Sequence, residues 1–369
     1  MTNRRISTAA AIALASALAL AGCTAPGGGA PRTSAATTPP PAPVSGSILG
    51  AGSMAQKSAL QEWAGLVAAA HPGAQVGFDA RGSALGRQAF REGQVPFAAS
   101  DVPFSTDEVA AGGFRACAEG AQLVEIPAYV SPVAIVFALD GVDALKLSPR
   151  ALAGVFAGTV TRWDDPAIVA TNPTAALPSK PILPVHRSDA SGTTAHVTDY
   201  LSQTAPDVWT AGTADTWPSA LDGRAAQGAA GLAAVVRATD GGIGYVDASV
   251  AGDLPSVQIK VGGGWMEASA AGARTAMDAA RIEQGRAPGD LATTIDRGTP
   301  ARGAYPVLLV GYLIGCSRYE DAETAALVKT FFSTAVSAEG QQRAADAAGS
   351  APISEELRTR AQAAIDLIS

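Results

Sequence analysis

Small polar residues occur beside an arginine and an aspartate in the segment 184–194, PVHRSDASGTT. The pattern predicts a short strand, a turn, and a helix that begins near Thr193. The first turn of a helix has free backbone N–H groups, which can surround a small anion together with nearby hydroxyls. Arg187 adds a planar cationic fork that Asp189 can hold in place. The donors expected in this anion cradle are Ser191, Gly192 and Thr193. On this segment alone, an ordinary helix cap is the alternative.

Two further glycine-rich loops precede predicted helices, GAGSMA at 50–55 and GSALG at 82–86. Their helices are expected to begin at Ala59 and Arg87, with small residues at the exposed N–H groups. Several helix N-termini can converge on one cleft, where their dipoles favour a small anion without many cations. The candidate residues of these loops are Ser53, Met54, Ala55 and Ser83.

A carboxylate follows the apolar strand FAAS, as Asp101. An ionised carboxylate can only accept hydrogen bonds, so it suits an anion that carries a proton, such as hydrogen phosphate, and repels fully ionised sulfate. The alternative is a helix cap for a segment that starts at Ser105.

The composition and the positions of reactive side chains narrow the function classes. The chain has 369 residues, 47% hydrophobic residues and a formal charge of -7, which is typical of a globular protein and unfavourable for nucleic-acid binding. Ser83 and Ser191 lie outside any G-x-S-x-G turn and have no assignable base, which argues against a phosphatase or serine hydrolase. His71, His186 and His196 are far apart, so no metal site and no cofactor are expected. The sequence predicts a binding protein rather than an enzyme.

The N-terminus has the layout of an exported lipoprotein. Two arginines precede an apolar run that ends in LAGC at 20–23, which resembles the lipobox of bacterial lipoproteins. We therefore predict a signal peptide over 1–22, lipidation of Cys23, and a Pro/Gly-rich tether over 23–47 that cannot bury enough apolar surface to fold. The expected location is the outer face of the cell membrane, reached by the Sec or the twin-arginine route.

Two other cysteines remain, Cys117 and Cys316. In an exported protein such a pair predicts a disulfide. Two buried free thiols are the alternative, because two residues offer no spacing pattern to test.

Beyond Ser47 the hydrophobic pattern predicts an α/β fold. The expected strands are 75–78, 124–126, 133–139, 182–186, 244–246 and 307–314. The expected helices are 59–70, 86–92, 148–156, 195–201, 228–238, 323–336 and 355–367. About 320 residues in this pattern suit two lobes better than one core.

From about Ile48 to the C-terminus the sequence resembles the phosphate-binding proteins of phosphate-specific ABC importers. The matching blocks are GAGSMAQ at 50–56, RGSALGRQAFREGQVPFAASDVPF at 81–104, LKLSPRALAGVFAGTVTRWDDPAI at 145–168, LPVHRSDASGTTAHVTDYLS at 183–202 and GLAAVVRATDGGIGYVDAS at 231–249. The resemblance implies a type II periplasmic-binding-protein fold, in which two α/β lobes joined by two crossing strands close over phosphate. It implies one lobe from 48–128 and 306–369, a second from 129–305, and hinges near 126–133 and 305–311.

Within this resemblance, the family's ligand serine falls on Ser83 and its proton-accepting aspartate on Asp101. The arginine and the Ser-Gly-Thr donors fall on Arg187, Ser191, Gly192 and Thr193. The first loop departs from the family pattern, because Met54 stands where a hydroxyl residue is usual and Ala55 where an aromatic residue is common. Ser53 and the backbone N–H groups of Met54 and Ala55 are expected to compensate. Arg81 is an added cation that either changes affinity or pairs with Asp79.

The resemblance therefore predicts a monomeric, non-enzymatic protein that delivers inorganic phosphate to the membrane subunits of an ABC importer. Binding of another oxyanion, such as arsenate, is the main alternative, and a phosphatase is a weaker one.

Overall fold

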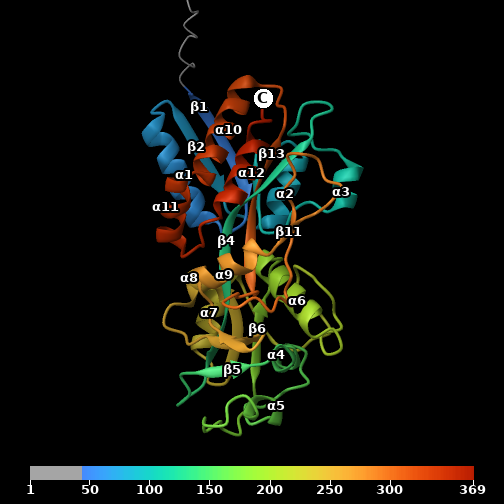
Figure 1. Ribbon diagram of the computed structural model, residues 1–369, viewed down its shortest axis with the longest axis vertical. Helices are drawn as coiled ribbons and strands as arrows, with labels where there is room; N and C mark the ends of the chain where they lie inside the picture. The colour runs from blue at the N-terminus through green and yellow to red at the C-terminus, as the bar shows by residue number, and fades with distance from the viewer. Residues whose placement is uncertain (1–43) are drawn as a thin grey trace, which may run out of the picture. The chain divides into compact units, whose positions relative to one another are not determined.

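The computed structural model describes residues 44–369, in which strands and helices alternate as predicted (Figure 1). The signal peptide, Cys23 and all but the last residues of the tether lie outside the described residues. None of the helices within 44–369 is long and apolar enough to cross a membrane.

An eight-stranded sheet in this part of the chain has the order β2-β1-β3-β13-β4-β8-β6-β7. Its strands are β1 (Gly46–Gly52), β2 (Ala74–Asp79), β3 (Ala98–Ser100), β4 (Leu123–Ala138), β6 (Leu183–Arg187), β7 (Arg224–Ala226), β8 (Gly242–Asp247) and β13 (Leu308–Cys316). Smaller sheets contain β5 (Leu145–Leu147), β9 (Val257–Val261) and β10 (Gly264–Met266), and β11 (Arg281–Ile282) with β12 (Thr293–Thr294).

Strand β4 joins the two lobes of the fold (Figure 1). Its first part pairs antiparallel with β13, as far as Pro132, and its second part pairs antiparallel with β8 from Val133 onward. Strand β13 in turn pairs with β3. The prediction of two separate strands at 124–126 and 133–139 was wrong, because backbone pairing with β13 continues through the intervening prolines.

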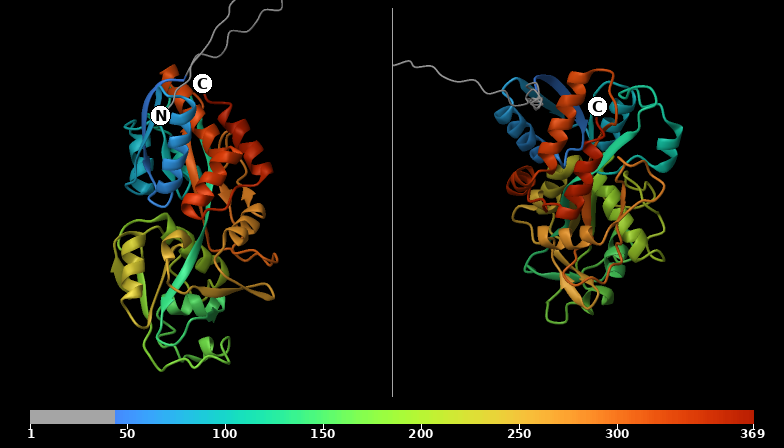
Figure 2. Two further views of the ribbon diagram at one scale, coloured as in Figure 1. Left: turned by 90° about the vertical axis from the view of Figure 1, so that its left-hand side faces the viewer. Right: turned by 45° about the horizontal axis from the view of Figure 1, so that its top comes forward.

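The helices around these sheets are α1 (Lys57–Ala70), α2 (Ser83–Arg91), α3 (Thr106–Ala111), α4 (Pro149–Phe156), α5 (Pro166–Val169), α6 (Gly192–Thr204), α7 (Gly228–Arg237), α8 (Ala248–Ala251), α9 (Ala270–Asp278), α10 (Ala322–Val336), α11 (Ala338–Ala348) and α12 (Glu355–Ile365). Figure 2 shows the C-terminal helices beside the N-terminal strands, and α1 packs on α10 and α11. Trp63 of α1 is fully buried there and donates to the Gly340 carbonyl oxygen at 2.8 Å.

Two predicted helix starts require correction. The GSALG loop was expected before a helix at Arg87, but α2 already begins at Ser83. Gly82 has φ of 105°, a conformation that glycine adopts readily, so the turn is completed one residue before Ser83. Helix α1 likewise begins at Lys57 rather than Ala59.

Candidate functional site

A cavity of about 130 Å³ brings the three predicted loops together. Its walls include all the predicted anion-binding residues except Ser53: Met54, Ala55, Ser83, Asp101, Arg187, Ser191, Gly192 and Thr193. A larger hollow of about 470 Å³ lies along residues 109–123 but contains none of these residues. The smaller cavity is therefore the candidate anion site.

One wall of the cavity is the N-terminus of α6. Ser191 is the N-cap residue, and its hydroxyl accepts from the Thr194 N–H at 3.5 Å. Gly192 and Thr193 follow in the first turn, where N–H groups have no acceptor within the helix. A Cβ added at Gly192 would lie 2.1 Å from the Cβ of Asp101, so only glycine allows the helix end to approach the carboxylate this closely.

The cationic wall is Arg187, which is 5% exposed. Its Nε donates to Asp189 Oδ1 at 2.8 Å, and its Nη2 pairs with the other carboxylate oxygen. Burial would raise the pKa of Asp189, but hydrogen bonds from Arg187 and from the Gly228 N–H lower it. Asp189 thus stays ionised and fixes the guanidinium plane, while Nη1 is not used by this pair.

The acceptor wall is Asp101, which is 3% exposed. Its Oδ1 accepts from Gln56 Nε2 at 3.0 Å and its Oδ2 from the Ser83 hydroxyl at 3.1 Å. Burial raises the pKa of Asp101, against the opposing effect of these donors. The carboxyl group has a hydrogen-bond donor at each oxygen and faces the N-terminus of α6.

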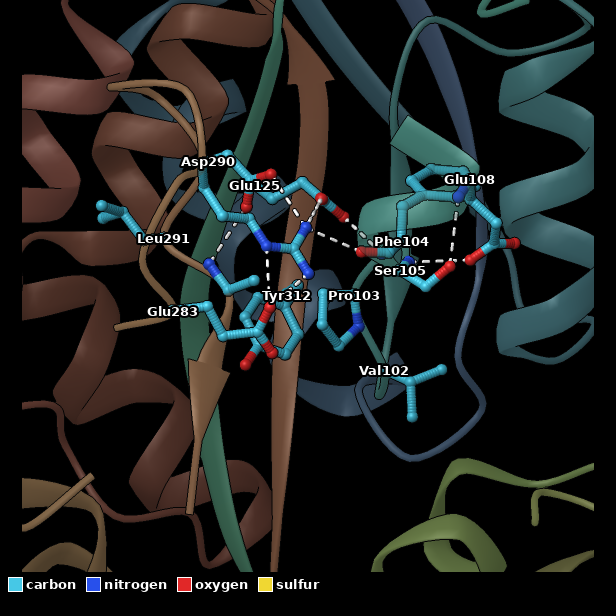
Figure 3. A network of polar contacts seen from close by, with 12 residues as sticks. Val102, Pro103, Phe104, Ser105, Glu108, Glu125, Glu283, Asp290, Leu291 and Tyr312 are labelled. Carbon is cyan, nitrogen blue, oxygen red and sulfur yellow. Dashed lines mark hydrogen bonds and ion pairs between the residues drawn. The ribbon is translucent and has the colours of Figure 1, made fainter. Parts of the chain in front are cut away.

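The loop after Asp101 is anchored by a buried ionic network (Figure 3). The Phe104 N–H donates to Glu125 Oε1 at 3.0 Å, and Arg286 Nη1 donates to the Phe104 carbonyl oxygen at 2.8 Å. Arg286 also donates to Asp290 at 3.0 Å and to Glu283 at 2.8 Å. Burial, followed by the nearby charge of Asp290, raises the pKa of Glu125 to about 8. This network fixes the far end of the loop that carries the acceptor.

Sequence reasoning missed two polar residues at this site. Gln56, fully buried, holds Asp101, and a glutamine inside GAGSMAQ gives no sign of a partner 45 residues away. Asp247 at the end of β8 adds a second carboxylate to the cavity wall and accepts from the Ser249 N–H at 3.0 Å. Burial raises the pKa of Asp247. Its position after GYV at a strand end was the available signal.

Ser53 was predicted to contribute to the anion site, and Arg81 was expected either to change affinity or to pair with Asp79; neither residue lines the cavity. Ser53 is fully buried and its Oγ accepts from the Ala55 N–H at 3.1 Å, so it caps the first loop. Arg81 pairs with Asp79, with Nε donating to Oδ2 at 2.9 Å, and it does not line the cavity. Both of these contacts shape the loops around the site.

Two further predictions concerned the cysteine pair and metal binding. Cys117 and Cys316 form a disulfide with a Cα–Cα distance of 5.3 Å, which ties the 113–121 segment to the end of β13. No group of three or more His, Cys, Asp or Glu side chains within residues 44–369 is placed to hold a metal ion.

Comparisons with known proteins agree on one family. The model described as "PBP superfamily domain" matches residues 37–339. Phosphate-binding protein PstS 3 of Mycobacterium tuberculosis is 31% identical over 379 residues, covering 100% of both chains. Phosphate-binding protein PstS of Haemophilus influenzae is 36% identical over 207 residues, 54% of this chain and 58% of the relative. Among solved structures, a high affinity periplasmic phosphate-binding protein (PfluDING) bound with phosphate has a TM-score of 0.68 at 22% identity, covering 86% of this chain and 93% of that chain.

Proposed function

Because this chain belongs to the PBP superfamily and to the PstS phosphate-binding proteins within it, we propose that it captures inorganic phosphate in the 130 Å³ cavity and delivers it to an ABC-type importer. The observation that carries this proposal is the meeting of three walls in one small cavity: a helix N-terminus, a fixed arginine, and a buried carboxyl acceptor. The relatives are named as phosphate-binding proteins, and we propose a non-enzymatic binding role for this chain as well.

In this proposal the α6 end and Arg187 donate to the phosphate oxygens. Gly192 and Thr193 would supply backbone N–H groups, Ser191 and Thr193 hydroxyls, and Arg187 its Nη1 group. The Ser83 hydroxyl hydrogen is donated to Asp101 and the Ala55 N–H to Ser53, so the backbone N–H groups of Ser83 and Met54 would complete the donor set. Ala55 lines the cavity beside them. Each hydrogen bond to a charged ligand contributes about 1.5–3 kcal/mol, so a few of them support micromolar binding after the costs of association.

Asp101 would select the anion by accepting a hydrogen bond from it. Hydrogen phosphate carries a proton that can point at the carboxylate, whereas sulfate at neutral pH offers only lone pairs. A sulfate oxygen and an Asp101 carboxylate oxygen with no hydrogen between them repel each other. This repulsion lowers the affinity for sulfate by more than the absence of one hydrogen bond would. The same argument admits arsenate, which is protonated in the same way.

Closure around phosphate would use β4 and β13 as the two crossings. We propose one lobe from 48–128 and 306–369 and a second from 129–305, with hinges at 126–133 and 305–311. The change of partner along β4, from β13 to β8 near Val133, supports a boundary there. Closing the lobes would exclude water and strengthen each charged hydrogen bond.

The family is one of extracytoplasmic binding proteins, and we propose that this chain works there as a monomer tethered to the membrane. The N-terminal pattern supports a signal peptide over 1–22 and a lipid on Cys23, followed by the tether. The importer's membrane subunits would then read the closed form and open it.

The selectivity is tested with Asp101→Asn, compared with the exposed substitution Asp207→Asn. Asparagine can donate to an unprotonated oxygen, so sulfate should compete with phosphate in the Asp101 variant and remain excluded in the control. The readout is displacement of radiolabelled phosphate by sulfate and by arsenate at pH 7. Equal exclusion of sulfate by all three proteins would refute the assigned role of Asp101.

A further inference from the structure

His196 lies one turn into α6, beyond the cradle residues, and both of its ring nitrogens have close polar partners. Nδ1 lies 2.7 Å from Nη2 of Arg297, and Nε2 lies 2.7 Å from the backbone carbonyl oxygen of Asp101. The Val310 backbone nitrogen is 3.3 Å from Nε2, which places the ring against β13. The imidazole belongs to α6 in one lobe. It therefore contacts the Asp101 backbone of the other lobe and the crossing strand β13.

These partners fix the tautomer of His196. A guanidinium only donates, so Nδ1 accepts from Arg297. A carbonyl oxygen only accepts, so Nε2 carries the hydrogen and donates it to Asp101. Nε2 then has no lone pair for the Val310 N–H, so their 3.3 Å approach is a packing contact. Burial and then the charge of Arg297 lower the pKa of His196 to about 3, so the ring is neutral at physiological pH.

Arg297 is 2% exposed and connects this histidine to the second crossing. Its Nε donates to Asp199 Oδ2 at 2.8 Å, which ties it back to α6. Its Nη1 donates to the carbonyl oxygens of Pro306 and Leu308 at 2.7 and 2.9 Å, at the start of β13. All three guanidinium nitrogens are thus used to hold neighbouring segments together.

The α6 end and Asp101 also meet directly at Gly192, where no Cβ could be accommodated. The acceptor is thus held against the donor helix at two points, the Gly192 contact and the His196 hydrogen bond. The first allows the close approach, and the second supplies an attractive contact that maintains it. Neither His196 nor Arg297 lines the cavity, so any effect on a ligand is indirect and passes through Asp101 or through α6.

We propose that His196 and Arg297 are positioning residues for phosphate: the chain of contacts from Asp199 through Arg297 and His196 holds the Asp101 backbone against α6 and sets the spacing between acceptor and donors. The inference rests on the proposed function, because phosphate is the anion whose release it controls. When the contact is lost, the Asp101 loop separates from α6 and phosphate leaves faster.

Two substitutions at one position separate positioning from folding. His196→Leu removes both contacts, whereas His196→Gln can restore both, with its side-chain oxygen accepting from Arg297 and its NH₂ donating to Asp101. Leu201→Ala is the matched control, because Leu201 is fully buried on the same helix and takes no part in these contacts.

Phosphate release is measured by stopped-flow tryptophan fluorescence, and amide hydrogen exchange over residues 98–104 is measured in the phosphate-free protein. Because His196 packs against the crossing strand β13, the His196–Asp101 contact persists in this proposal when the lobes open. We expect His196→Leu to release phosphate about tenfold faster, because, of the two lost contacts, only the hydrogen bond to Asp101 holds the acceptor loop, and to exchange faster over 98–104. His196→Gln should match the wild type, and Leu201→Ala should lower the melting temperature without either change.

The proposal would be overturned if His196→Leu released phosphate and exchanged its amides at the wild-type rates. It would also be overturned if Leu201→Ala changed both rates as much as His196→Leu does. The exchange experiment needs no phosphate, so it tests the positioning role of His196 independently of the proposed phosphate binding. A wild-type protein that fails to bind phosphate refutes the proposed function alone, provided that exchange over 98–104 still responds to His196→Leu and not to the control.

Discussion

Replacing Glu125 by glutamine should stabilise the fold increasingly as the pH rises. The Glu125 side chain is fully buried, and burial together with the charge of Asp290 raises its pKa from 4.5 to about 8. Glutamine keeps an oxygen that can accept from the Phe104 N–H, now 3.0 Å from Oε1. It also removes the charge from Oε2, which has no hydrogen-bond partner within the described residues.

The sign follows from proton linkage. The folded state holds the Glu125 proton more tightly than the unfolded state does. The contribution of Glu125 to the unfolding free energy is therefore fully present below pH 4.5 and is lost as the pH rises through about 8. A shift of this size corresponds to about 5 kcal/mol above pH 8 and about 3 kcal/mol at pH 7. Glutamine does not titrate, so Glu125→Gln should lack this loss.

The assay is urea unfolding of wild type and Glu125→Gln at intervals from pH 5 to pH 9. Glu267→Gln, which changes an exposed glutamate, serves as the control and should follow the wild type. The difference between Glu125→Gln and wild type should grow by about 3–5 kcal/mol across this range. Parallel curves for wild type and Glu125→Gln would show that Glu125 does not hold a proton in the folded protein.

Three further outcomes are expected. Gly192→Ala should weaken phosphate binding by about 1–3 kcal/mol in a titration, since its Cβ would lie 2.1 Å from that of Asp101; unchanged affinity would contradict the packed geometry. Reducing the Cys117–Cys316 bond, which closes a separation of 199 residues, should lower the unfolding free energy by about 2–5 kcal/mol and leave phosphate affinity intact. Met54→Thr should tighten phosphate binding by up to one charged hydrogen bond, about 1.5–3 kcal/mol, if the first loop contacts the anion; an unchanged dissociation constant would exclude that contact.

The residues that line the candidate anion site could be predicted from the sequence because their signals are local. A strand, a turn and small residues at a helix start follow one another in 184–194, and the structure places that helix end in the cavity. The acceptor was predictable for a similar reason, since Asp101 comes directly after a buried strand. Residue types and short spacings are enough for such features.

The remaining features depend on contacts between distant parts of the chain. The Arg297–His196 contact spans 101 residues and the Arg286–Phe104 contact 182, and no spacing rule relates them. Strand β4 was predicted as two pieces, at 124–126 and 133–139, whereas pairing with β13 makes it continuous through Pro127 and Pro132. Tertiary pairing overrode local propensity there.

The most direct test of phosphate capture is isothermal titration of the ligand-stripped wild-type protein with phosphate at pH 7, without and with excess sulfate. The proposed function predicts a saturable one-site isotherm, with a dissociation constant in the micromolar range or below, that sulfate does not alter. Absence of heat that saturates with phosphate, or its abolition by sulfate, would contradict the central claim.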